Sequence, residues 1–69
     1  MELRLYLEYH GIGIGAFAKQ LGVSHEAVRR YCLGERVPRY RHMVRIAQLT
    51  KGRVKPDDWL EAMKKRVAV

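Results

Sequence analysis

Four polar residues lie close together in the chain and carry side chains that donate or accept several hydrogen bonds: His25, Glu26, Arg29 and Arg30. Their spacing places them on one side of a helix. The forked guanidinium of Arg30 matches the O6 and N7 atoms of guanine, and Arg29 is expected to contact phosphate. Glu26 either accepts a hydrogen bond from cytosine N4 or stabilises the N-terminus of the helix. The set therefore fits the base edges and backbone of DNA.

The charge of the chain is positive and unevenly distributed. The net charge is +7, from 14 lysines and arginines and seven acidic residues. Nine basic residues and a single acid, Glu35, lie from Arg29 to Lys55, so this segment carries +8 and the rest of the chain −1. Such a local excess is typical of polyanion binders, although a solvated basic surface is the alternative. We expect phosphate contacts from Arg36, Arg39, Tyr40 and Arg41; for Arg39, Tyr40, Arg41 and the neighbouring His42 the alternative is a solvated helix face.

Other classes of function find little support in the residues. His10, His25 and His42 are scattered, and the lone Cys32 is too little for a zinc cluster, so no metal is expected. The glycine-rich stretch 11–15 lacks the spacing of a nucleotide-binding loop. No acid–base pair or nucleophile constellation indicates an enzyme, and no cofactor or small-molecule ligand is expected. The single cysteine and the absence of a long apolar run predict a cytoplasmic protein without a membrane segment.

The periodicity of apolar residues predicts one all-α domain over residues 1–69, without strands. Helices are expected at 2–9, 14–21, 25–33, from Pro38 to about 50, and from Pro56 to about 67. Glycines mark the ends of the first three, and Ser24 is suited to cap the third. The side chains expected to face inward are Leu3, Tyr6, Leu7, Phe17, Ala18, Leu21, Val28, Tyr31, Cys32, Met43, Ile46, Ala47, Thr50, Trp59, Leu60, Met63 and Val67.

The second and third of these helices meet the requirements of a helix-turn-helix. Ala18 is small enough for a close helix crossing, and Gly22 tolerates the positive φ of a short turn. Val28 and Tyr31 would hold the third helix against the second. In this arrangement the third helix enters the major groove of DNA.

Residues 17–38, with Ala18, Gly22, Val28 and Tyr31 in register, resemble the Cro/repressor-type (XRE-like) helix-turn-helix family of phage and bacterial regulators. The resemblance implies a compact five-helix, lambda-repressor-like fold that binds duplex DNA, typically as a homodimer on a near-palindromic operator. It also implies base contacts from Ser24, His25, Glu26 and Arg30, and backbone contacts from Gly15, Arg36 and Arg39. The chain departs from the family pattern at Ile14 and Gly13, where that family often has a phosphate-binding Gln and a capping Ser or Thr.

The expected function is therefore that of a Cro-type transcriptional repressor in the cytoplasm of a bacterial or phage-infected cell, associated with the nucleoid. Two alternatives remain at this level. One is an excisionase-like recombination accessory factor that bends DNA. The other is an antitoxin-like module that binds a protein partner through Asp57, Asp58 and the apolar tail 67–69.

Overall fold

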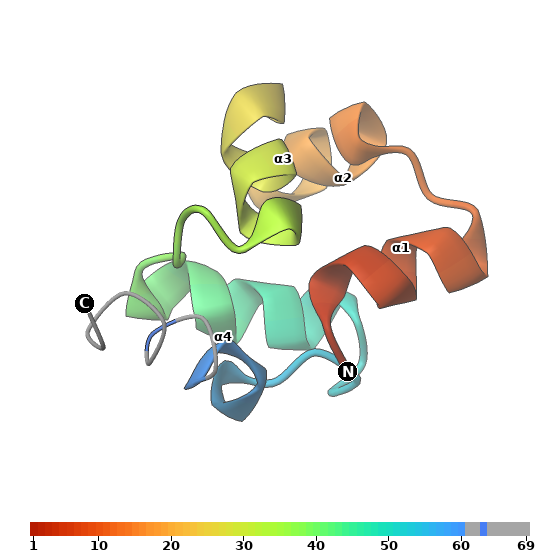
Figure 1. Cartoon of the computed structure of the whole chain (residues 1–69). Coiled ribbons are helices and arrows are strands. Elements are labelled where there is room, and N and C mark those ends of the chain that lie inside the picture. Colours follow the sequence, from red (N-terminus) through yellow and green to blue (C-terminus); the bar gives the residue numbers. More distant parts are fainter. Residues whose placement is uncertain (61–62, 64–69) are drawn as a thin grey trace.

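The computed structural model describes residues 1–60 and 63, and this part of the chain is helical and free of strands. It forms four α-helices, α1 (Leu3–His10), α2 (Ile14–Leu21), α3 (His25–Leu33) and α4 (Tyr40–Leu49), followed by a 3₁₀ turn, η1 (Pro56–Trp59). Figure 1 shows α4 running across the base of the molecule, beneath α2 and α3. The predicted all-α class is confirmed.

Local signals in the sequence set the ends of α2 and α3, and both helices have the predicted bounds. Gly22 ends α2 with a left-handed φ of 82°, and its N–H donates to the Ala18 carbonyl at 2.8 Å. Two residues later Ser24 begins the next helix, because its Oγ accepts a hydrogen bond from the Ala27 N–H at 3.1 Å. Only residues 22–24 therefore separate α2 from α3.

The core lies where α2 meets α3 and α4, with α1 packed against α3 and η1 against α4. Most residues predicted to face inward are buried, among them Phe17, Val28 and Ile46. Cys32 and Ala47 are only half-buried. Burial that the sequence did not predict occurs at Ala27, Pro38 and Val54.

The predicted fifth helix is not confirmed over the residues that the structure describes. Pro56 opens a 3₁₀ turn of four residues, in which only Trp59 reaches the core. Leu60 and Met63, predicted to be internal, are 48% and 42% exposed, so that prediction is wrong. Residues three apart eclipse one another in a 3₁₀ turn, so Trp59 shares a side with Pro56 and Leu60 falls on another. The predicted burial of Val67 lies outside the described residues.

Two details of the C-terminal half also differ from expectation. The fourth helix begins at Tyr40 and not at Pro38, because Arg39 remains extended with a ψ of 157°. At η1, Lys55 has no capping side chain of its own, but its N–H donates to the Asp58 carboxylate at 2.8 Å. The other Asp58 oxygen lies 2.8 Å from the Met1 ammonium nitrogen, which joins the start of α1 to η1.

Thr50 fixes the exit from α4. It is fully buried, and its hydroxyl donates to the Ile46 carbonyl at 2.8 Å while accepting from the Val54 N–H at 3.0 Å. A single hydroxyl thus ties the helix to the segment that leads into η1. This bond leaves the buried Val54 N–H satisfied, which a purely apolar side chain at position 50 could not do.

Replacing Thr50 with valine is therefore expected to lower the free energy of unfolding by about 1–3 kcal/mol, the cost of a buried donor without an acceptor. Urea titration followed by circular dichroism measures this change. Thr50→Ser is the matched control, because it keeps the hydroxyl and loses only a methyl group. Equal losses in the two variants would contradict the assigned role of the hydroxyl.

Candidate nucleic-acid interface

Helix α3 is held by one face and presents the other to solvent. Ala27, Val28 and Tyr31 are buried on the inner face, with Val28 fully enclosed. The other side of the helix carries the residues predicted to read bases or bind phosphate. Ser24, His25, Glu26 and Arg30 are exposed, and Arg29 is half-buried. The structure therefore brings these five predicted residues to one surface.

Three of these side chains form a hydrogen-bonded cluster centred on Glu26. Arg29 donates through Nε to Oε1 at 2.8 Å and through Nη2 to Oε2 at 2.7 Å, a two-pronged ion pair. Arg30 donates through Nε to Oε2 at 3.1 Å. Among the described residues, the two terminal nitrogens of Arg30 donate no hydrogen bond. Arg30 therefore keeps the pair of donors that a guanine edge requires.

The electrostatics of the cluster keep Glu26 ionised. Hydrogen bonds from Arg29 and Arg30 lower the pKa of Glu26 to about 2, against an opposing effect of desolvation. The same contact with Glu26 raises the pKa of Arg29. The cluster therefore carries one net positive charge at neutral pH instead of two.

The N-terminus of α2 lies beside the start of α3. A Cβ built on Gly15 would stand 3.6 Å from Cδ2 of His25, so the two predicted contact residues are neighbours. No side chain caps α2, whose N-cap is Gly13. The first N–H groups of a helix have no intrahelical acceptor and attract anions. An anion placed there would be within reach of His25 as well.

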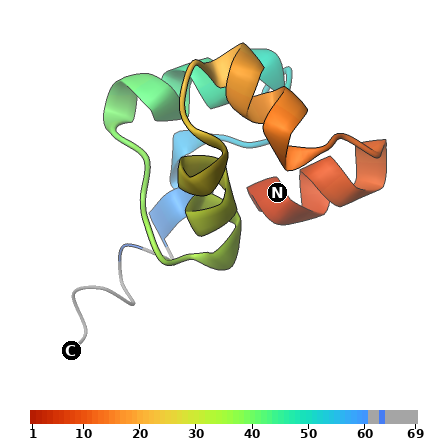
Figure 2. The same ribbon diagram turned by 90° about the horizontal axis from the view of Figure 1, so that it is seen from above.

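A groove of about 330 Å³ continues from the start of α3 to the start of α4. The chain returns to this place through the connection between α3 and α4, which Figure 2 shows running along the outside of the molecule. The groove is lined by Ser24 and by three predicted phosphate-binding residues: Arg36, Arg39 and Arg41. Its lining thus combines a helix start with three arginines, a combination suited to an anion.

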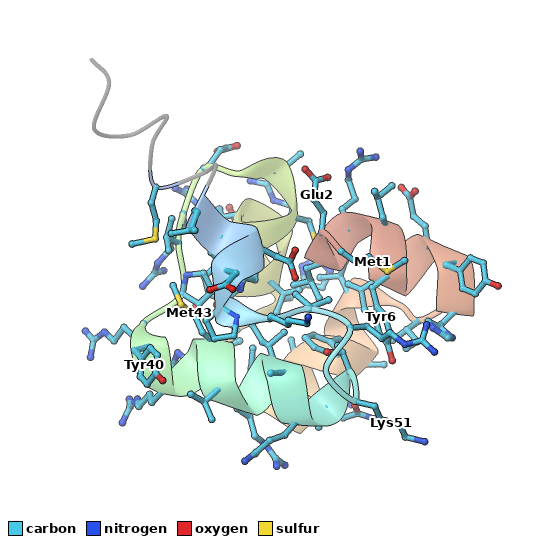
Figure 3. The ribbon with its side chains drawn as sticks, turned by 90° about the horizontal axis from the view of Figure 1, so that it is seen from below. Met1, Glu2, Tyr6, Tyr40, Met43 and Lys51 are labelled. Atoms are coloured by element: carbon cyan, nitrogen blue, oxygen red, sulfur yellow. The ribbon has the colours of Figure 1, made fainter. Side chains whose placement is uncertain are left out.

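His42 also lines this groove, and its Nδ1 is enclosed without a hydrogen-bond partner among the described residues. Tyr40 does not line it: its ring lies at the surface at the start of α4 (Figure 3) and is 71% exposed. Of the ten predicted site residues, Gly15 and Tyr40 lie neither in the groove nor on α3; Gly15 is a neighbour of His25, whereas Tyr40 stands at the start of α4.

Sequence reasoning missed the pairing of Glu26 with both arginines. The spacing alone contained the signal, because residues three and four apart on a helix are neighbours and opposite charges at those distances pair. The groove was less accessible to prediction, since it forms only when residues 36–42 fold back against Ser24.

Cys32 has no features of a reactive thiol. Burial, the dominant influence, raises its pKa, so the nucleophilic thiolate is disfavoured. Within residues 1–60 and 63, no three His, Cys, Asp or Glu side chains gather in a way that could hold a metal ion. Nor does any helix described here have the length and apolar character needed to cross a bilayer. Comparisons with protein-family models, curated proteins and solved structures give no match.

Proposed function

We propose that this chain is a sequence-specific binder of double-stranded DNA and acts as a transcriptional regulator. The observation that carries the proposal is the position of Ser24, the N-cap of α3, which lines the groove together with three arginines and directly precedes the exposed His25 and Glu26. One surface thus combines side chains suited to base edges with cations suited to phosphates, the two kinds of contact that specific DNA binding needs.

In this proposal α2 and α3 form a helix-turn-helix, with α3 in the major groove. Arg30 donates its free terminal nitrogens to a guanine, and Ser24, His25 and Glu26 face neighbouring bases. Arg36, Arg39 and Arg41 hold one phosphate strand at the groove, while the N-terminus of α2 near Gly15 approaches the other. Arg29 contacts phosphate from the edge of α3, and Tyr40, exposed at the start of α4, contacts phosphate outside the groove.

The regulator we propose is a Cro-type repressor. Two copies would bind half-sites about 34 Å apart on a near-palindromic operator, one helical turn of DNA. Repression would follow from occlusion of the polymerase, and the protein would act in the cytoplasm at the nucleoid. Binding and not catalysis is the proposed activity, with no cofactor.

Selection of duplexes from a random pool tests this function directly. The purified chain is expected to enrich a motif of about four base pairs per half-site in inverted repeat. A single unrepeated motif would contradict the dimer and leave DNA recognition standing. A pool that shows no enrichment over several rounds would contradict sequence-specific recognition.

Replacing Arg39 with alanine is expected to weaken binding to all duplexes alike and to reduce the salt slope by about 0.9, the value of one phosphate contact on B-DNA. The measurement is Kd by fluorescence anisotropy between about 50 and 200 mM salt, the range over which such slopes are large. Arg4→Ala on α1 is the matched control, since it removes another exposed arginine, one away from the groove. An unchanged slope in Arg39→Ala would contradict the groove as a phosphate site.

A further inference from the structure

We propose that Glu26 is the positioning residue that sets the balance between specific and non-specific DNA binding. Its carboxylate holds Arg30 ready to read guanine and, at the same time, occupies Arg29 so that its charge is less available to any phosphate. This inference rests on the proposed function and assigns its specificity to an acidic side chain within a strongly basic surface.

The hold on Arg30 uses the part of the guanidinium that base recognition does not need. Arg30 donates to Glu26 through Nε alone, at 3.1 Å, so neither terminal nitrogen is used in the hydrogen bond to the carboxylate. A free arginine side chain samples many rotamers, and fixing one of them before binding lowers the entropy lost on recognition. Glu26 therefore favours the fork geometry in which Arg30 distinguishes guanine from the other bases.

The hold on Arg29 has the opposite consequence. Nε and Nη2 of Arg29 both donate to Glu26, at 2.8 and 2.7 Å. A phosphate must displace Glu26 from these two nitrogens or bind Arg29 through the remaining nitrogen, Nη1, alone. Non-specific affinity for DNA comes almost entirely from neutralised phosphates. Glu26 therefore removes about one charge from that sequence-independent attraction while it orients the neighbour that reads the sequence.

The two effects act in the same direction on discrimination. Contacts to phosphate strengthen binding to every duplex, whereas the contact of Arg30 strengthens binding to one base. Weaker phosphate contacts and a better-positioned Arg30 together increase the difference in affinity between the preferred duplex and all others. The cluster is exposed on α3, and exposed ion pairs contribute little to folding. Removing the carboxylate is thus expected to change recognition and leave the fold intact.

The test compares Glu26→Gln with Glu8→Gln. Glu8 is an exposed acid on α1 that pairs with Arg4 at 3.5 Å across the same i,i+4 spacing, in the reverse order. Both variants raise the net charge by one. Each is titrated at neutral pH with the preferred duplex from the selection, with that duplex altered at each G·C pair in turn, and with a random duplex. A second readout needs no DNA: the ¹⁵N–¹H resonances of the arginine Nε–H groups report whether Arg29 and Arg30 are held.

For Glu26→Gln we expect tighter binding to the random duplex, with a salt slope steeper by about 0.9. We also expect a loss of about fivefold or more in the preference for one guanine, the lower end of what a bidentate arginine contact gives. The Nε–H resonances of Arg29 and Arg30 should shift in this variant. Glu8→Gln should match the wild type in guanine preference, in random-duplex binding and in the Arg29 and Arg30 resonances.

Several outcomes would overturn the proposal. If Glu26→Gln and Glu8→Gln lose the same amount of guanine preference, the loss comes from the change in net charge and not from the position of Glu26. An unchanged guanine preference in Glu26→Gln would remove the positioning role, and altered preference at a cytosine would make Glu26 a direct reader. Unshifted resonances would show that the arginines are not held. If the wild-type chain binds no duplex, the proposed function itself fails, and shifted resonances would then establish the cluster without a role in DNA recognition.

Discussion

Replacing Phe17 with alanine is expected to leave the chain largely unfolded at 37 °C. Phe17 is 1% exposed on α2, the helix that packs against both α3 and α4. Truncating a buried phenylalanine costs about 3–5 kcal/mol, because the lost burial is joined by the cost of a cavity. The whole stability of a domain of this size is roughly 3–10 kcal/mol. One side chain thus accounts for a large part of what keeps α3 on the core.

Thermal melting followed by circular dichroism measures this effect. Tyr9→Ala is the matched control, since Tyr9 is an aromatic residue of similar size that is 79% exposed on α1. Its free energy of unfolding should stay within about 0.5 kcal/mol of the wild type. A Phe17→Ala variant that melts at the wild-type temperature would contradict the central position of α2.

The second large effect is expected from Arg30→Ala. It removes the fork that we assign to guanine, so discrimination at one base pair should fall by about 1–3 kcal/mol, or about 5- to 150-fold in relative Kd. Arg30→Lys separates fork from charge: it keeps the cation and the phosphate attraction, yet cannot form the bidentate contact. Both variants should therefore lose preference at the same position, with a lower overall affinity in Arg30→Ala alone.

Kd values for the preferred duplex and its single-base variants test this. The neighbouring Arg29→Ala supplies the comparison, because a phosphate contact should weaken all duplexes alike and leave the preference unchanged. If Arg30→Ala also weakens every duplex by the same factor, Arg30 is a second phosphate contact and the base-reading role is wrong.

The bounds of α2 and α3 could be predicted because their signals are local. Gly22 and Ser24 sit directly at the helix ends that they determine, and the inner face of each helix follows from residue spacing. The burial of Val54 could not be predicted in this way. It depends on the buried hydroxyl of Thr50, which turns the chain back after α4. The predicted burial of Leu60 and Met63 was wrong for a related reason, because a pattern suited to a helix does not show which side of it faces a distant core.

One part of the candidate site could likewise be predicted from local spacing, and the other part could not. The polar face of α3 follows from spacing within nine residues, and the Glu26 pairs could have been found there too. The groove could not, because it joins Ser24 to Arg36, Arg39 and Arg41 across a loop whose path is set by tertiary packing. Charge counting indicated residues 29–55, which include the three arginines of the groove, whereas only the fold separates Tyr40 from the arginines beside it.

The aromatic pair behind α3 gives the molecule an optical reporter. Trp59 is the only tryptophan in the chain, and it is 5% exposed. Its ring lies edge-on to Tyr31, with centroids 6.1 Å apart and planes at 73°. Tyr31 belongs to the inner face of α3, so the tryptophan is separated from the surface assigned to DNA by the thickness of the helix. Its fluorescence therefore follows how firmly α3 is seated on the core, and it does so without a dye or an added label.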